Sequence, residues 1–181
     1  LKTIGKKSFN ARSWYKAKIP FSNELFVEAS KDILSAIHAS KGLTKKLLIL
    51  DLDNTLWGGV IGEDGIENID LGGHSAIGES FVDFQKNILN LKSRGILIAI
   101  VSKNNEIDAL HAIENHPEMI LKKKDFVSWR INWENKENNI IEIVEELNLG
   151  LDSVVFIDDS EIERNRILNF LPHVLVPEFP A

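Results

Sequence analysis

The sequence predicts an α/β fold, a Rossmann-like three-layer sandwich in which helices cover both faces of a central parallel sheet. Short apolar runs typical of buried strands alternate along the chain with longer amphipathic stretches typical of helices. Because such an alternation connects parallel strands through right-handed crossovers, the helices lie on both faces of the sheet. Ligands bind outside the carboxyl ends of the strands in these sheets, so the residues that follow each strand are candidates for function.

The expected strands and helices follow one another in order. The strands occupy five apolar runs, at residues 47–50, 96–101, 126–129, 154–157 and 174–176. The helices fill the intervals between them, at residues 79–93, 105–115, 136–148 and 161–170. The helix at residues 136–148 carries apolar side chains on one face, as expected for a helix that packs on a sheet.

An N-terminal extension, residues 1–42, precedes this pattern. Residues 1–22 mix glycine, proline, aromatic and basic residues without a regular apolar spacing, which favours a linker or an extended arm. Ser22 can cap a helix whose apolar residues recur every three or four positions as far as Gly42, and we expect this helix to pack on the core. Residues 43–181 then form one catalytic domain, and we expect the chain to be part of a longer multidomain protein.

The composition is that of an ordinary globular protein, with 44% hydrophobic and 27% charged residues and a net charge of -6. Nucleic-acid binding usually needs a concentrated basic surface, and the basic run Lys122–Lys124 is short and followed by Asp125. The absence of cysteine excludes disulfides, zinc-thiolate sites and thiol nucleophiles within these residues. No apolar stretch approaches the roughly twenty residues that cross a bilayer. We therefore expect a cytoplasmic protein without a nucleic-acid or membrane partner.

Two pairs of acidic residues directly follow two of the expected strands. Asp51 and Asp53 come after the first strand, and Asp158 and Asp159 come after the fourth. If those strands are neighbours, the carboxyl groups gather at one edge and repel one another, so a shared proton or a bound cation has to neutralise them. Oxygen ligands without histidine or cysteine suit Mg²⁺. Helix capping explains any one of these acids, but it does not readily explain both pairs together.

Three further polar residues are expected at the same edge. Ser102 and Asn104 follow the second strand, where the N-terminus of the next helix could hold a phosphate by its backbone N–H groups. Lys136 begins the helix after the third strand. Each has a simpler interpretation on its own, because a serine before a helix is usually an N-cap and a lone lysine is usually solvated. Their shared position after the strands favours phosphate binding.

Together these residues resemble, in order and setting, the four motifs of the haloacid dehalogenase (HAD) superfamily. The motifs are Asp51-x-Asp53-x-Thr55, Ser102, Lys136 and Asp158-Asp159. The longer strings DLDNTLWGGVIGEDG, SKNN, HPEM, INWENKENNI and VFIDDSEIER are similar to the FkbH-like branch of that superfamily, from about residue 20 to the end. Members of this branch are associated with loading a glyceryl unit from a glycolytic bisphosphoglycerate onto an acyl carrier protein while phosphate is removed.

The resemblance implies a magnesium-dependent phosphatase or phosphotransferase that acts on a phosphorylated small molecule or an acyl phosphate. Asp51 would attack phosphorus to form an aspartyl phosphate, while Asp53 protonates the leaving oxygen and later activates water. The implied Mg²⁺ ligands are Asp51, the backbone carbonyl of Asp53, Asp158 and, directly or through water, Asp159. The residues implied to hold the phosphoryl group or other parts of the substrate are Ser102, Lys136, Thr55, Asn104 and Trp57.

The glycine-rich segment at residues 57–65 is typical of a small hairpin flap over the site. Trp57 either touches the substrate or fills the core beneath the flap, and the sequence leaves both interpretations open. Neither interval between motifs is long enough for a large cap domain once its helices are counted. We therefore expect an open site, which suits a carrier-borne substrate as well as a small one.

Other functions fit the residues less well than a phosphatase. Superfamily dehalogenases do not use an acid at the position of Asp53, and receiver domains are phosphorylated after the third strand, not the first. Glyceryl transfer to an acyl carrier protein needs a thiol, which would come from the carrier or a separate domain because this chain has no cysteine. A catalytically silent scaffold for carrier proteins would be expected to lack Asp51 or Lys136. We rank generic phosphatase activity first and glyceryl transfer as its elaboration.

Overall fold

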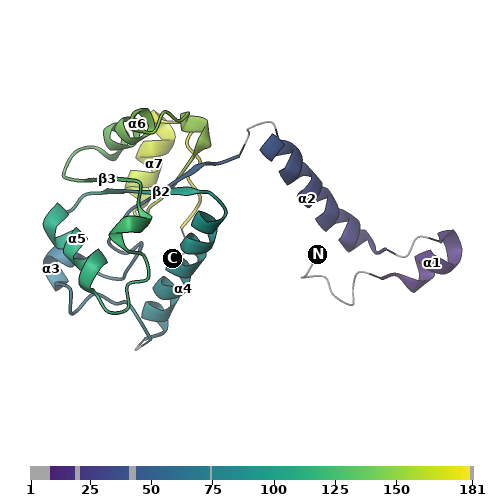
Figure 1. Ribbon diagram of the computed structural model, residues 1–181, viewed down its shortest axis with the longest axis horizontal. Coiled ribbons are helices and arrows are strands. Elements are labelled where there is room, and N and C mark those ends of the chain that lie inside the picture. Colours follow the sequence, from purple (N-terminus) through teal and green to yellow (C-terminus); the bar gives the residue numbers. More distant parts are fainter. Residues whose placement is uncertain (1–8, 19–20, 41–43, 74, 180–181) are drawn as a thin grey trace. The chain divides into compact units, whose positions relative to one another are not determined.

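The computed structural model describes residues 9–18, 21–40, 44–73 and 75–179 (Figure 1). The chain divides into two compact units, Leu1–Thr44 and Lys45–Ala181. None of the described helices is both long and apolar enough to cross a membrane.

The first unit contains the helices α1 (Ala11–Ala17) and α2 (Asn23–Ser40). The helix α1 differs from the arm predicted for residues 1–22. Its own residues, Ala11–Ala17, include no glycine or proline, and the alanine, arginine and lysine among them favour helix. The predicted cap of α2 is present, since the hydroxyl of Ser22 accepts the N–H of Leu25 at 3.2 Å. The packing of this helix on the second unit stays a prediction.

The second unit is built on a parallel four-stranded sheet in the order β3-β2-β1-β4. The strands are β1 (Leu47–Leu50), β2 (Leu97–Ser102), β3 (Ser128–Ile131) and β4 (Val154–Ile157). All four residues of β1 are buried, because β1 has a neighbour on each side and helices on each face. The parallel strands deliver their carboxyl ends to one edge of the sheet.

Helices cover both faces of this sheet, which confirms the predicted three layers (Figure 1). They are α4 (Ala76–Ser93), α5 (Glu106–Asn115), α6 (Lys136–Glu146) and α7 (Glu161–Phe170). Leu48 and Leu50 share a core with residues of α4 and α5, whereas Leu47 and Ile49 share one with residues of α6 and α7. Because successive side chains of a strand point to opposite faces, each helix pair covers one face.

Three strands differ from the prediction, and one of them, β2, is shifted by a single residue from the predicted 96–101 to Leu97–Ser102. The strand predicted at residues 126–129 begins two residues later, because a 3₁₀ turn, η2 (Lys123–Asp125), precedes it and the Asp125 carboxylate accepts the N–H of Lys122 at 2.8 Å. The expected fifth strand is reduced to a single parallel bridge between Leu175 and Val155. The proline that follows it, Pro177, has no N–H to extend a ladder. A further 3₁₀ turn, η3 (Leu151–Ser153), leads into β4.

The flap between β1 and α4 is small, as predicted, but it contains the one-turn helix α3 (Ile61–Asp64) instead of a regular hairpin. An antiparallel bridge between Gly58 and Asp70 closes its base, with reciprocal N–H to carbonyl bonds of 3.0 and 2.8 Å. Gly59 has a φ of 94°, and a Cβ there would lie 2.6 Å from the Asp64 carboxylate. The tight turn into α3 therefore requires a glycine.

Candidate active site

Side chains from several elements meet at the carboxyl edge of the sheet. Asp51 follows β1 and Asp158 follows β4, and these neighbouring strands stay in register to their last residues. The N–H of Asp51 donates to the carbonyl of Ile157 at 3.0 Å and so continues the ladder into the site. Lys136 is the first residue of α6, and Ser102, which is buried, is the last residue of β2. The topology therefore brings these sequence-predicted residues to one edge.

Lys136 joins the two acids of the central strands. Its Nζ lies 2.9 Å from Oδ2 of Asp51 and 2.6 Å from Oδ2 of Asp158. Only 2% of Lys136 is exposed, so the simpler interpretation of a solvated lysine does not hold. Burial on its own lowers the pKa of a lysine, but the charges of Asp51 and Asp158 outweigh it and the pKa of Lys136 is raised. The ammonium is therefore charged at neutral pH.

Three carboxylates are placed where they could hold a metal ion. Asp51, Asp158 and Asp159 each offer one oxygen, and these oxygens lie within 4.8 Å of one another. Three carboxylates against the one ammonium of Lys136 leave two negative charges, which a divalent cation would balance. Oδ1 of Asp51 is buried and has no hydrogen-bond partner among the described residues. Because such an atom is costly without a partner, both the charge and the oxygen donors fit Mg²⁺.

The pKa values of the cluster reflect the same excess of negative charge. Burial raises the pKa of Asp158 to about 6, the charge of Asp51 adds to the rise, and Lys136 opposes it. Burial and the charge of Asp51 also raise the pKa of Asp159. A bound cation would favour the ionised forms of these acids.

Asp53 is held by three N–H donors. The indole Nε1 of Trp57 and the backbone N–H of Ile61 donate to Oδ1 at 2.9 and 3.1 Å, and the amide of Asn104 donates to Oδ2 at 2.8 Å. Burial raises the pKa of Asp53 and the charge of Asp51 adds to the rise, while the three donors act in the opposite direction. A raised pKa and a fixed orientation suit a group that gives a proton in one step and takes one in another.

The three residues predicted to contact the substrate are engaged with other protein groups in the structure. Trp57 has 0% exposure and packs in the core. Of the two interpretations of this residue, the structure agrees with the one in which it fills the core beneath the flap. Asn104 is buried, and its amide nitrogen is used on Asp53. Thr55 is also buried, and its hydroxyl accepts the N–H of Asp159 at 3.2 Å. All three orient residues of the carboxylate cluster or Asp53.

Arg164 and Glu163 have contacts that sequence reasoning missed. The guanidinium of Arg164 donates to the backbone carbonyls of Asp158, at 2.8 Å, and of Asp159. Glu163 pairs with Lys103 at 2.7 Å, which ties the segment after β2 to α7 across the central strand. The sequence indicates for both residues no more than electrostatics at the start of a helix. The sequence feature that points to these two residues is their position in the first turns of the helix that follows the acidic pair.

Gln85 is another polar residue that the sequence did not single out. It has 0% exposure, and its side-chain nitrogen donates to the carbonyl of Leu56 at 2.8 Å. Its side-chain oxygen accepts the N–H groups of Ile120 and Leu121 at 2.9 and 3.1 Å. This one amide therefore connects the chain after the first motif to the segment that follows α5.

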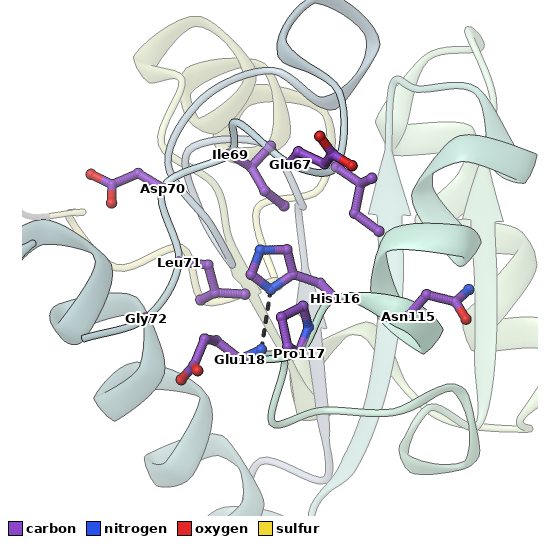
Figure 2. Close-up of a pocket in the computed structure, with 10 residues that line it drawn as sticks. Glu67, Ile69, Asp70, Leu71, Gly72, Asn115, His116, Pro117 and Glu118 are labelled. Atoms are coloured by element: carbon purple, nitrogen blue, oxygen red, sulfur yellow. Dashed lines mark hydrogen bonds between the residues drawn. The ribbon is translucent and has the colours of Figure 1, made fainter. Parts of the chain in front are cut away.

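A separate cavity of about 580 Å³ lies between the segment after α3 and the end of α5 (Figure 2). His116 lines it between Leu71 and Pro117, and its Nδ1 accepts the N–H of Glu118 at 3.3 Å (Figure 2). Burial lowers the pKa of His116, which favours the neutral ring. None of the predicted catalytic or metal-binding residues lines this cavity, so we do not assign it to the active site.

Solved structures are similar to the chain, whereas no family model and no curated protein matches it. The N-terminal part of the protein BF1531 from Bacteroides fragilis contains a phosphatase domain and was solved complexed with Mg. It is 45% identical over 96% of this chain, with a TM-score of 0.80. The match covers 46% of that chain, so the present chain spans about half of its length.

More distant structures share the fold. A HAD family enzyme from Bacteroides thetaiotaomicron, in complex with magnesium and inorganic phosphate, is 18% identical with a TM-score of 0.51. The match covers 76% of this chain and 95% of that one. A predicted HAD-like family hydrolase from Porphyromonas gingivalis is 12% identical with a TM-score of 0.52, over 76% of this chain and 93% of that one.

Proposed function

Because the chain belongs to the haloacid dehalogenase superfamily, we propose that it is a magnesium-dependent phosphohydrolase in which Asp51 becomes transiently phosphorylated. The observation that carries this proposal is the state of the Asp51 carboxylate. One oxygen lies 2.9 Å from Lys136, and the other is buried without a hydrogen-bond partner among the described residues. A carboxylate that is fixed by Lys136 and not otherwise hydrogen-bonded can give one oxygen to a cation and attack phosphorus with the other.

Mg²⁺ would be held by the carboxylates of Asp51 and Asp158 and the backbone carbonyl of Asp53, with Asp159 as a further or water-mediated ligand. When bound, it polarises the phosphoryl group and offsets negative charge on the groups that react. The cluster of three carboxylates supports this assignment, as do the magnesium complexes of the structures from Bacteroides fragilis and Bacteroides thetaiotaomicron.

Lys136 and Ser102 would hold the phosphoryl oxygens. A carboxylate and a phosphate that each carry a unit charge repel by about 4 kcal/mol at 4 Å and an effective dielectric near 20. The Lys136 ammonium, fixed between Asp51 and Asp158, offsets part of this repulsion. Ser102 ends the neighbouring strand β2, where its hydroxyl could donate to another oxygen of the same group.

Asp53 would act as the acid and then as the base. In the first step a bond forms between an Asp51 oxygen and phosphorus, the bond to the leaving oxygen breaks, and Asp53 gives that oxygen its proton. In the second step water attacks phosphorus and passes a proton to Asp53, which releases phosphate and restores Asp51. Trp57, Asn104 and the N–H of Ile61 support this role because they fix the direction of the Asp53 carboxylate.

The substrate would be a phosphorylated small molecule or an acyl phosphate. A finer proposal rests on the resemblance to the FkbH-like branch, in which removal of phosphate accompanies transfer of a glyceryl unit to an acyl carrier protein. The small flap supports it by leaving the edge open to a carrier-borne substrate. Because this chain contains no cysteine, the receiving thiol would belong to the carrier or to another polypeptide segment.

Release of inorganic phosphate from a panel of phosphomonoesters and acyl phosphates tests the proposal. We expect turnover that requires Mg²⁺, is stopped by EDTA, and falls by several orders of magnitude in Asp51→Asn. Asp83→Asn, which changes an acid with 71% of its side chain exposed, is the matched control and should keep the wild-type rate. Turnover that persists in Asp51→Asn would contradict the proposal. A folded protein without activity on any panel member would favour the silent scaffold instead.

A further inference from the structure

An apolar cavity of about 620 Å³ lies at the carboxyl edge of the sheet, apart from the cavity of Figure 2. Its walls are the first half of α4, the end of β4 and the tail that follows α7. The apolar side chains that line it are Ile77, Phe81, Phe84, Ile157, Pro177 and Phe179. The tail is held in place by the bridge of Leu175 to β4 and by an edge-to-face contact of Phe179 with Phe84, whose ring centroids are 6.4 Å apart.

This cavity adjoins the candidate active site, although no predicted catalytic or metal-binding residue lines it. Thr55 lines it, and the same side chain accepts the N–H of Asp159. Ile157, which also lines it, is the residue before Asp158. Phe81 lies against the flap, since a Cβ built on Gly58 would be 3.1 Å from its ring. A molecule in the cavity would therefore lie next to the segments that follow β1 and β4 and next to the flap.

The lining favours a carbon-rich occupant. Its two hydroxyl groups already have partners in the protein: that of Thr55 accepts the N–H of Asp159, and that of Ser80 donates to the carbonyl of Ile77 at 2.7 Å. The remaining charged group, Glu178, is exposed and would repel an anion. The volume falls within the range of small-molecule sites, which are mostly apolar with few polar groups. A phosphate does not fit this chemistry, whereas an aliphatic or aromatic group does.

We propose that this cavity binds an apolar part of the substrate, so that the chain prefers phosphomonoesters or acyl phosphates whose organic portion carries an aliphatic or aromatic group. The inference rests on the proposed function, because it assigns the phosphoryl end of the same molecule to Asp51. Each methylene that enters the cavity should then raise kcat/KM by roughly fourfold until the cavity is full.

Turnover of a series of n-alkyl phosphates, from methyl to octyl, with Mg²⁺ tests the inference. We expect kcat/KM to rise with chain length in the wild type and the rise to flatten in Ile77→Ser and Phe179→Ala. Leu91→Ser is the matched control, because Leu91 is a partly exposed apolar residue of α4 that does not line the cavity. It should keep the wild-type dependence. A wild-type rate that does not depend on chain length, or a dependence that survives both cavity variants, would overturn the inference.

Calorimetric binding of the same alkyl phosphates to Asp51→Asn, in the presence of Mg²⁺, separates this inference from the proposed function. Binding that tightens with chain length although the wild type releases no phosphate would overturn the phosphohydrolase and keep the cavity. Magnesium-dependent turnover with equal binding of short and long esters would keep the phosphohydrolase and overturn the cavity. If the esters neither turn over nor bind in a length-dependent way, both proposals fail.

Discussion

Replacing Lys136 by methionine removes the ammonium that holds the carboxylates together while keeping most of the side-chain volume. In the wild type, Nζ lies 2.9 Å from Asp51 and 2.6 Å from Asp158, and both ion pairs are buried. In the variant the carboxylates of the cluster would face one another without the positive charge of the Lys136 ammonium. We therefore expect the folded state of the metal-free protein to be strongly destabilised.

The size of the effect follows from the geometry. Each ion pair corresponds to an attraction of about 6 kcal/mol at an effective dielectric near 20, but the cost of burying the three charges offsets most of it. Breaking a buried pair by removing one partner typically costs about 3–5 kcal/mol. Because the pKa of Lys136 is raised, its contribution is fully present below the pKa of an unfolded lysine and is lost only as the pH rises through the folded value. At about pH 8 the whole effect should be visible.

Urea unfolding in EDTA, followed by tryptophan fluorescence, measures this destabilisation. Excess Mg²⁺ should recover part of the stability of Lys136→Met, because a divalent cation would then neutralise the same carboxylates. Lys86→Met is the control, since it removes an exposed pair with Asp83 and should change the free energy of unfolding very little. A destabilisation in Lys136→Met no larger than in this control would refute the reasoning.

Three further predictions concern the same cluster. Because burial raises the pKa of Asp158 to about 6, the metal-free folded state keeps a proton that the unfolded state has released. The wild type should therefore lose about 3 kcal/mol through this group as the pH rises from about 4 to about 6. Asp158→Asn should lack this loss when the free energy of unfolding is measured with urea at several pH values across this range. A free energy that falls with pH as steeply as in the wild type would contradict the prediction. Arg164→Gln should weaken Mg²⁺ binding by about tenfold or more in isothermal titration, because it frees the backbone of two metal-ligand candidates; equal affinity would contradict this positioning role. Trp57→Phe keeps an aromatic ring in the core but removes a donor to Asp53, so steady-state kinetics should show kcat falling by roughly tenfold with little change in KM, whereas an unchanged kcat would argue against orientation by the indole.

The strands whose bounds could be predicted from the sequence are those whose apolar runs end directly at an acidic residue. Leu47–Leu50 and Val154–Ile157 have the predicted bounds, because acids follow both runs and the chain leaves the sheet there. The edge strand β3 is displaced by two residues, since Phe126 belongs to a turn although it is as apolar as a strand residue. A buried apolar residue can lie in a turn or in a strand, and local hydrophobicity does not distinguish the two cases.

The members of the candidate site could be predicted because parallel strands deliver their carboxyl ends to one edge. Asp51, Asp158 and Lys136 meet there for that reason. The burial of Lys136 and the bond from Trp57 to Asp53 depend instead on how the flap and α6 are folded over that edge. Contacts such as those of Arg164 join a side chain to backbone carbonyls, and a position near the start of a helix does not by itself predict them. These parts of the site became visible only in three dimensions.

The most direct test of the central claim is to trap the phosphorylated enzyme. The protein would be mixed with a substrate and Mg²⁺, quenched in acid during turnover, digested, and analysed by mass spectrometry for a phosphorylated peptide. We predict a phosphoryl group on Asp51 that appears only with Mg²⁺, decays as phosphate is released, and is absent from Asp51→Asn. Steady release of phosphate with a phosphoryl group on another residue, or with none on the protein at any time, would contradict the claim that Asp51 is the nucleophile.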